Sequence, residues 1–578
     1  MPLPLLTVLV LGGLALGYAL YGRLLARFYR LDPDAPTPAH THRDGLDFEP
    51  AAPGYLLGQH FAAIAAAGPI VGPILACAQF GWLPCVLWVV LGSIFIGAVH
   101  DLSALVASVR HEAQTIAAVV REHLGRRAWG AFLAFIWLAL VYVIVAFTDV
   151  TASTFVGRID ELDGVRVEFE RGGAVAFASA AYLLLAVVMG LVQRRFAPPL
   201  WLVTVVFVPA TLGVVWLGTR CSTWLALAPG GAVHPKLAWG VVILAYCFVA
   251  SLVPVWALMQ PRGYLGGFVL YLVLATGAVG LLFGGFTVEQ PAFRGLVQTG
   301  ADGAPTPTGL LFPFLFVTIA CGACSGFHGL VCSGTTSKQL DRETHGTAVG
   351  YGGMLLEAFV ALVALGTVMI VAAPEGGPGA VYGRGIGEFL CVVVGREHLL
   401  VATVFGAMAF STFVFDTLDV ATRLGRHVLQ ELLGWRGRAG AAAGTLATIA
   451  LPLAIVLGAD PEAKGYVAFW TLFGASNQLL AALTLLGVSV WLARTGRPPW
   501  FTLVPGLFVL GMTLWALARL AWGGLAGARG PDGGLALATL MNGLAALALI
   551  GLALFLVVEA WHARPAGGAP PAGVSASA

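Results

Sequence analysis

The stretch Gly68-Pro69-Ile70-Val71-Gly72-Pro73 decides the fold of this chain. It lies inside an apolar segment from about Tyr55 to Gln79 and places two Gly-Pro pairs four residues apart. Each proline removes a backbone donor and clashes with the carbonyl four residues earlier, and each glycine leaves the backbone uncovered. In a membrane such a break is tolerated only where the freed backbone groups are buried or line a wet cavity. Because transporters use broken helices to present half-helix ends to substrates and ions, we expect this break to form half of a transport site.

The composition of the chain predicts a membrane protein. Hydrophobic residues make up 58% of the sequence and charged residues 10%, whereas soluble domains carry about 25% charged residues. Repeated apolar runs of about 20 residues, separated by short polar loops, predict an all-α polytopic membrane protein with about 15 transmembrane helices. No basic, aromatic-interleaved patch indicates a nucleic-acid partner, and no Walker-type phosphate loop indicates direct use of ATP.

The charges in the loops predict the orientation of these helices. The predicted spans are 3–22, 55–79, 82–109, 128–156, 174–192, 199–218, 238–258, 264–284, 310–333, 347–373, 399–420, 440–458, 466–492, 500–521 and 534–560. If each span crosses the bilayer, the loops on one side hold 20 of the 31 Lys and Arg residues. The positive-inside rule then places the N-terminus outside and the C-terminus in the cytoplasm. The first span carries no Lys or Arg before its apolar run, so we interpret it as a membrane helix and not a cleaved signal peptide.

The spans divide the chain into four regions. These are an N-terminal membrane helix with the start of a cytoplasmic linker (1–30), a ten-helix transporter core (55–420), peripheral C-terminal helices (440–562) and an Ala/Pro/Gly/Ser-rich tail expected to be disordered (564–578). A second broken helix is expected around Pro254 and Pro261. Because it begins five spans after the first, a unit that starts there would be inverted, which predicts a 5+5 inverted repeat. The alternative is that Pro254 only kinks a helix.

Ionisable side chains inside the spans are candidates for ion coupling, because such groups are costly in a bilayer. Glu357 has apolar neighbours on both sides, so its ionised form is disfavoured and it suits a group that exchanges a proton near neutral pH. His60 and His328 are candidate proton carriers or substrate ligands. Asp101 lies nearer a span end. The alternative for each is a structural hydrogen bond between helices.

Two polar pairs lie further along the chain. Asp416 and Asp419 are three residues apart on one helix face, which Arg423 extends toward the cytoplasm. Asp419 and Arg423 are therefore a candidate gate that pairs and unpairs during transport, or else an interfacial charge cluster. The pair Asn477-Gln478 is expected to form interhelical hydrogen bonds.

The cysteines do not indicate a disulfide framework or a metal site. The eight cysteines lie mostly within apolar runs. The pair Cys321-x-x-Cys324 precedes His328 and Cys332 in a segment rich in small residues, with no second ligand cluster nearby. We therefore expect no metal ligands and no cofactor other than a coupling proton or sodium ion.

Five motifs resemble the carbon starvation protein A family. They are Gly58-Gln-His-Phe-Ala-Ala-Ile-Ala-Ala-Ala-Gly-Pro-Ile-Val-Gly-Pro-Ile-Leu75, Leu311-Phe-Pro-Phe-Leu-Phe-Val-Thr-Ile-Ala-Cys-Gly-Ala-Cys-Ser-Gly-Phe-His328, Ser333-Gly-Thr-Thr-Ser-Lys338, Gly350-Tyr-Gly-Gly-Met-Leu-Leu-Glu357 and Phe473-Gly-Ala-Ser-Asn-Gln478. The resemblance extends from about Arg30 to Ala493. In two places the chain departs from the family: position 337 is Ser where Pro is usual, and the stretch 373–398 is shorter than in longer members, so that peripheral helices are expected to be missing there.

The resemblance implies a transporter of the bacterial inner membrane with a leucine-transporter-type core, related to the amino acid–polyamine–organocation superfamily. Members are linked to peptide uptake during carbon starvation, and some relatives to pyruvate uptake with protons. Carried onto this chain, the resemblance places substrate between the two broken helices. It places a coupling cation near Ser325 and the neighbouring hydroxyl groups. The expected substrate-binding residues are His60, Gly68, Pro69, Gly72, Pro73, Pro254, Ser325 and His328, and the expected ion-coupling residues are Glu357, Asp101, Ser325 and Ser333.

The leading hypothesis is secondary active import of small carboxylated nutrients, peptides or pyruvate, across the lipid bilayer. A half-helix N-terminus after Pro69 or Pro73 would offer unpaired N–H groups to a carboxylate. The alternatives are a membrane nutrient sensor that retains a transporter fold and an intramembrane enzyme, but no nucleophile–base spacing supports an enzyme. The sequence leaves open peptide against pyruvate, proton against sodium, and the oligomeric state.

Overall fold

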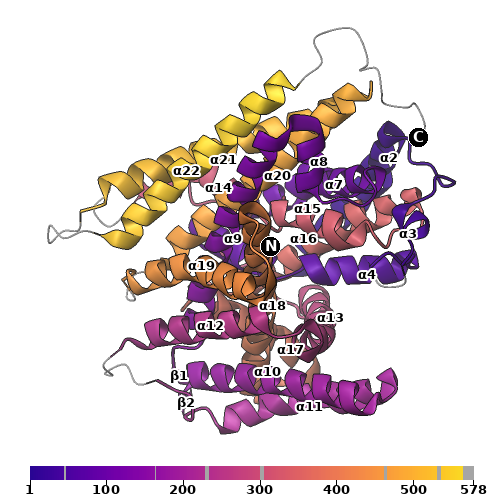
Figure 1. The fold of residues 1–578 in the computed structure, drawn as a ribbon. Helices are drawn as coiled ribbons and strands as arrows, with labels where there is room; N and C mark the ends of the chain where they lie inside the picture. Colours follow the sequence, from indigo (N-terminus) through magenta and orange to yellow (C-terminus); the bar gives the residue numbers. More distant parts are fainter. Residues whose placement is uncertain are drawn as a thin grey trace.

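The computed structural model describes residues 1–44, 47–162, 165–227, 233–299, 305–460, 465–529 and 536–563. The tail 564–578, predicted to be disordered, lies outside the described residues. Helices dominate the described part of the chain, which also contains two short antiparallel hairpins (Figure 1). The predicted all-α class is confirmed.

Among the described residues, 13 helices are long and apolar enough to cross a membrane, and a bent pair raises the number to 14. The 13 are Leu3–Tyr29 (with α1, Leu3–Gly17, and α2, Arg23–Tyr29), Trp82–Arg110 (with α6, Trp82–Gly92, and α7, Ala98–Arg110), α9 (Arg126–Thr154), α10 (Arg171–Phe196), α11 (Leu200–Arg220), α12 (Pro235–Leu252), α13 (Met259–Phe283), Glu343–Met369 (with α16, Gly352–Met369), Arg396–Leu433 (with α18, Leu399–Leu433), α19 (Gly437–Leu457), α20 (Gly465–Arg494), α21 (Trp500–Ala526) and α22 (Leu537–His562). The bent pair is α4 (Pro53–Ile64) and α5 (Gly68–Phe80). The shorter elements are α3 (Pro38–Thr41), α8 (Ile116–Leu124), α14 (Leu311–Thr318), α15 (Gly326–Val331), the π-helical turn η4 (Cys332–Thr336), α17 (Pro378–Val394), and the hairpins β1 (Ile159–Leu162) with β2 (Val165–Phe169) and β3 (Val297–Thr299) with β4 (Pro305–Leu310).

The first break lies just before the Gly-Pro pairs and not between them. The chain leaves helical geometry at Ala65, and α5 begins at Gly68 with Pro69 in its first turn, where proline fits because its missing N–H has no partner to lose. Pro73 lies inside α5. The helices α4 and α5 are bent by 52° with respect to each other. The predicted break is therefore confirmed, with its position moved toward the N-terminus.

The second break is in a different place from the one expected. Pro254 lies in the turn between α12 and α13, and Pro261 lies in the first turn of α13, so neither proline interrupts a helix. The expectation of a broken helix around Pro254 was therefore wrong. The predicted span 310–333 is instead divided into α14 and α15 by the non-helical residues 319–325.

The two breaks are in direct contact. A Cβ atom added at Gly72 would overlap the carbonyl oxygen of Thr318, and one added at Gly68 would overlap the side chain of Cys321. The second break also touches α16, because a Cβ at Gly322 would come within 2.7 Å of the Cβ of Ala361. Glycine at positions 68 and 72 therefore lets the start of α5 approach the second break closely, and glycine at 322 lets that break approach α16.

Side chains from neighbouring helices satisfy the backbone groups that the second break leaves free. The indole N–H groups of Trp88 and Trp470 donate to the carbonyls of Ile319 and Thr318 at 3.1 and 3.0 Å. On α20, the adjacent pair Asn477-Gln478 serves both halves of the broken helix. The amide of Gln478 donates to the Phe316 carbonyl at 2.8 Å, and Asn477 Oδ1 accepts from the Phe327 N–H at 3.0 Å. The predicted interhelical hydrogen bonds of this pair are confirmed.

Helix α20 lies inside the bundle, although the region 440–562 was expected to be peripheral. It packs against α9, α14 and α15, and residues 469–492 of this helix are all buried. Helices α21 and α22 lie at one edge of the bundle and α10 and α11 at the opposite edge (Figure 1). The peripheral assignment therefore does not hold for α20, because this helix supplies the polar groups that the second break requires.

Helix α17 was not among the predicted spans, and it lies in the stretch 373–398, where peripheral helices of longer family members were expected to be missing. Glycine recurs every fourth residue, at 379, 383 and 387, and faces α18. Added Cβ atoms at these positions would come within 2.8 Å of Phe410, Ala407 and Thr403 respectively. These glycines let α17 pack closely against α18, which explains how this short, partly charged helix is held in the bundle.

Substitution of Gly72 by Ala tests the contact between the breaks. The added methyl group overlaps backbone that cannot move without shifting α14, so we expect a loss of about 1–3 kcal/mol of stability, the usual cost of overpacking a core. Thermal unfolding of the purified protein in detergent measures this as a lower melting temperature. Gly511→Ala is the matched control, because its Cβ would meet open space in α21. Equal melting temperatures for the two variants would contradict the close contact.

Candidate functional site

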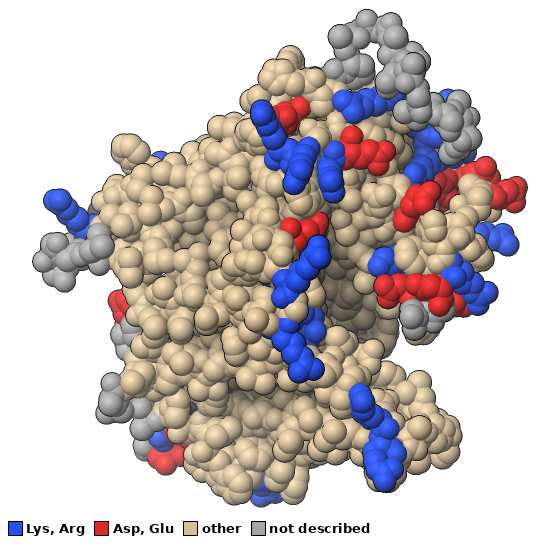
Figure 2. Space-filling model, in the orientation of Figure 1, with Lys and Arg blue, Asp and Glu red and all other residues tan. Residues whose placement is uncertain are grey.

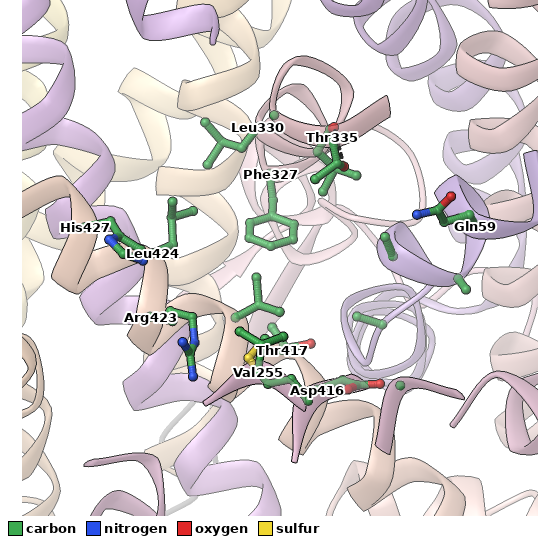
Figure 3. A pocket seen from close by; sticks show the side chains of 18 of the residues that line it. Gln59, Val255, Phe327, Leu330, Thr335, Asp416, Thr417, Arg423, Leu424 and His427 are labelled. Atoms are coloured by element: carbon green, nitrogen blue, oxygen red, sulfur yellow. Dashed lines mark hydrogen bonds between the residues drawn. The ribbon is translucent and has the colours of Figure 1, made fainter. Parts of the chain in front are cut away.

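A cavity of about 710 Å³ lies next to the first break, between α4, α13, α15 and α18. Figure 2 shows the molecule hollowed where α4 and α13 lie in Figure 1, on the side where charged side chains gather. In Figure 3, Gln59 of α4 lies across the cavity from Arg423 and His427 of α18, with Phe327 between them. The wall is mostly apolar with a few polar groups, and its volume is typical of small-molecule sites.

None of the eight residues expected to bind substrate is among the residues that line this cavity. Gly68, Pro69, Gly72 and Pro73 are buried in the contact between the breaks. The cavity wall instead contains residues close to the expected ones in sequence, namely Gln59, Ala65, Ala66, Val255, Phe327 and Leu330. At the first break, the chain just before α5 faces the open space; after the second break, Phe327 and Leu330 of α15 face it.

A cluster of buried ionisable side chains lies on the other side of the broken helices. Asp101 of α7 lies between two histidines: Oδ1 is 2.7 Å from His100 Nδ1, and Oδ2 is 2.8 Å from His328 Nδ1. The other ring nitrogen of His328 lies 3.0 Å from Glu357 Oε2 of α16. All four side chains are at most 2% exposed. The structure thus joins Asp101, His328 and Glu357, three of the predicted residues, in one chain of contacts.

Several polar atoms of this region have no hydrogen-bond partner among the described residues. They are Glu357 Oε1, His100 Nε2 and His60 Nε2. His60 of α4 makes one contact, from Nδ1 to Thr336 Oγ1 at 3.0 Å. A buried polar atom without a partner costs about 1–3 kcal/mol, so these atoms are available to a proton, an ion or a water molecule.

The two predicted serines make structural hydrogen bonds. Ser325 Oγ accepts from the Asn477 amide at 3.1 Å. Ser333 Oγ accepts from the Ile116 N–H at 3.1 Å and donates to the Gly329 carbonyl at 2.7 Å. Only Ser333 also lines the cavity.

Asp419 pairs with Arg262 and not with Arg423. The Arg262 guanidinium bonds to both Asp416 and Asp419 and also donates to the Phe415 carbonyl at 3.0 Å. Arg423 instead donates to the carbonyls of Ala250 and Val253 at the end of α12. The predicted pairing of Asp419 with Arg423 was therefore wrong, because the carboxylates turn toward α13.

The site residues predicted from the sequence do not include Arg262 or Tyr246. Arg262 falls between the predicted spans 238–258 and 264–284, yet only 1% of its side chain is exposed. Tyr246 of α12 donates to Asp419 at 2.8 Å. One pattern in the sequence could have indicated Arg262: two acidic residues, Asp416 and Asp419, lie on one face of a membrane helix. Such a pair predicts a cationic partner on a neighbouring helix.

Comparison with known proteins gives consistent matches. The family model described as carbon starvation protein CstA matches residues 4–375 and 371–516. The peptide transporter CstA of Campylobacter jejuni is 31% identical over 86% of this chain and 78% of that protein, and its Escherichia coli namesake is 32% identical over 87% and 78%. The pyruvate/proton symporter BtsT of Escherichia coli is 30% identical over 86% and 78%. Among solved structures, a manganese transporter of Eremococcus coleocola aligns at 15% identity and a TM-score of 0.45, over 88% of this chain and 95% of that chain.

The two aspartates that pair with Arg262 provide a test of the ion-pair geometry. Asp419 is 1% exposed and Asp416 is 35% exposed. Asp419→Asn leaves a buried guanidinium without its buried partner, so we expect a loss of about 3 kcal/mol or more, against about 1 kcal/mol for Asp416→Asn. Melting temperatures of the two variants in detergent measure the difference. A larger loss for Asp416→Asn than for Asp419→Asn would contradict the assignment.

Proposed function

This chain belongs to the carbon starvation protein CstA family, and we propose that it is a cation-coupled secondary transporter. Its substrates are small carboxylated nutrients, peptides or pyruvate, which it imports across the bacterial inner membrane during carbon starvation. The coupling ion is a proton. The relatives named peptide transporter and pyruvate/proton symporter support this substrate class.

One observation carries the proposal: the buried Asp101–His328–Glu357 chain lies directly behind the broken helix that lines the cavity. His328 belongs to α15, and its sequence neighbours Phe327 and Leu330 belong to the cavity wall. A change of charge at His328 therefore acts on the same short helix that touches the substrate space.

The coupling step follows from the cost of buried charge. With Glu357 and Asp101 ionised, His328 is held between two carboxylates as an imidazolium, and α15 is fixed to α7 and α16. When Glu357 takes up a proton, it loses its charge attraction for His328 and the hold on α15 weakens. Proton uptake thus changes the free energy of moving α15, and with it one wall of the cavity.

We propose that two inverted five-helix units underlie this arrangement, each beginning with a broken helix. The first contains α4–α5, α6–α7, α9, α12 and α13, and the second contains α14–α15, α16, α18, α19 and α20. The helix contacts support this pairing: α12 packs against α19, and each of these two helices also packs against both α9 and α18. Helices α10 and α11 are then an insertion in the first unit. Relative motion of two such units is the usual route to alternating access.

We propose that the Arg262–Asp416–Asp419 cluster holds together one side of the gate. It ties α13 to α18, and these two helices form the cavity wall opposite α4. On the positive-inside rule we place this end of the bundle in the cytoplasm, with the N-terminus outside, and propose that the cavity opens to the cell interior. Closure of α4 toward α13 would then seal the cytoplasmic side.

Uptake into proteoliposomes tests the proposal. Purified protein is reconstituted, and entry of labelled dipeptide and pyruvate is followed with and without an imposed proton gradient in sodium-free buffer. We expect accumulation above equilibrium only with the gradient, and Glu357→Gln abolishes it because the side chain no longer changes charge. Counterflow of labelled against unlabelled substrate persists in this variant, because exchange needs no net proton movement.

Glu397→Gln is the matched control, because Glu397 is 73% exposed and remote in sequence from the cluster. It should accumulate substrate like the unmodified protein. Gradient-driven accumulation by Glu357→Gln at the control level would remove Glu357 from the coupling role. Absence of uptake of both substrates under every gradient would overturn the proposed function itself.

A further inference from the structure

A tight turn between α7 and α8 places three candidate metal ligands together, and none of the three belongs to the cavity wall or to the buried cluster. Among the described residues, His111, Glu122 and His123 each offer a ligand atom, and these atoms all lie within 4.8 Å of one another. His111 follows α7, while Glu122 and His123 lie in the last turn of α8. The group therefore joins two elements.

The backbone of the turn is strained in a way that fixes His111. Glu112 and Ala113 both have positive φ, 58° and 55°, a conformation that residues with side chains rarely adopt. The Ala113 N–H bonds to the Ser108 carbonyl at 2.8 Å, and Ser108 Oγ donates to the Gln114 carbonyl at 2.7 Å. Strain of this kind persists only where the surrounding contacts overdetermine it, and it is frequent at ligand sites.

The hydrogen bond from Nδ1 of His111 makes its other ring nitrogen an acceptor, which can also act as a metal ligand. Its Nδ1 lies 2.6 Å from the Ala107 carbonyl oxygen, which can only accept, so Nδ1 carries the proton. The lone pair of a neutral ring is then on Nε2, which points at His123 Nε2 at 2.8 Å. A histidine that donates one N–H to a backbone carbonyl and presents the other nitrogen is the usual arrangement of a metal-binding imidazole.

The surroundings hold the two rings in place. The His111 ring lies edge-on to the Trp491 ring at 5.4 Å between centroids and to the His123 ring at 5.0 Å. Glu122 is exposed, so it supplies a negative charge on the solvent side. The cation Arg494 also lies near His123. The Nε–H of Arg494 donates to the Ala563 carbonyl.

We propose that His111, Glu122 and His123 bind one divalent transition-metal ion of the zinc class. Two imidazole nitrogens and one carboxylate oxygen are ligands that Zn²⁺ accepts, with a water molecule completing a tetrahedron. Two nitrogens bound to one Zn²⁺ are about 3.3 Å apart, so the rings need to separate by only about half an ångström. His123 moves its ring proton from Nε2 to Nδ1 as it binds, and the ring stays neutral.

The bound ion would cross-link the end of α7 to α8 beside the cavity. Thr115 and Ala117, at the start of α8, line the cavity, and the Ile116 N–H bonds to Ser333 of the second broken helix. Metal binding therefore fixes a loop that contacts the moving part of the proposed transporter. The site does not depend on the proposed function, since its ligands lie outside both the cavity wall and the buried cluster.

Cobalt binding to the full-length protein tests the site. The purified protein in detergent is freed of metal with a chelator and titrated with Co²⁺, whose visible absorption is intense when the ion is four-coordinate. We expect one Co²⁺ per chain, displaced by Zn²⁺, and a melting temperature that rises with added Zn²⁺ because only the folded state holds the ligands together. His111→Gln and His123→Gln should lose the absorption band and the stabilisation.

Two further variants keep the test decisive. Glu122→Gln changes an exposed side chain that does not support the fold, and we expect at least about tenfold weaker Co²⁺ binding. His398→Gln, which changes an exposed histidine elsewhere, should bind like the unmodified protein. No saturable Co²⁺ band in the unmodified protein, or an equal band in His111→Gln, His123→Gln and Glu122→Gln, would overturn the proposal.

Discussion

The contact between the two helix breaks is the constraint on which the rest of the structure depends. Unwound backbone inside a bilayer must find partners within the protein, and here each break supplies part of the surroundings of the other. Gly68 and Gly72 permit the approach, and side chains from two other helices complete the hydrogen bonding of the second break: Trp88 of α6, and Trp470 and the pair Asn477-Gln478 of α20. Because the breaks close on each other, the open space forms beside them, where α4 stands away from α13 and α18. The cavity is thus a consequence of the contact.

The ionisable groups are divided between the two sides of this contact. On one side, Asp101, His328 and Glu357 are fully enclosed and connect three elements through short distances. On the other side, Arg262 and its two carboxylates connect α13 to α18 at the cavity wall. Buried ion pairs contribute little net stability, since desolvation offsets most of their attraction, but they are sensitive to the loss of a single charge. That sensitivity suits a protein whose helices must change partners when a proton binds.

The sequence predicted the membrane class, the first break, the family and the hydrogen-bonding role of Asn477-Gln478, because each depends on local chemistry. It did not predict the second break, since residues 319–325 contain no proline and unwind only because neighbouring side chains offer partners for the freed carbonyls. Pro254 carried a strong local signal but terminates a helix, a distinction that depends on where the chain turns next. The partner of Asp419 was missed for a similar reason: Arg423 is adjacent on the same helix, whereas Arg262 approaches from α13 through tertiary packing. The acids were therefore predictable, and the cation between them was not.

Proton entry driven by substrate tests the central claim, that the buried cluster couples a proton to transport. Proteoliposomes with a pH-sensitive dye in the lumen are prepared without any gradient in sodium-free buffer, and dipeptide is added outside, with protein-free liposomes as the baseline. We predict that the lumen acidifies as labelled dipeptide enters, and that Glu357→Gln shows no acidification. Entry of the dipeptide through the unmodified protein with no change in lumenal pH would contradict the account.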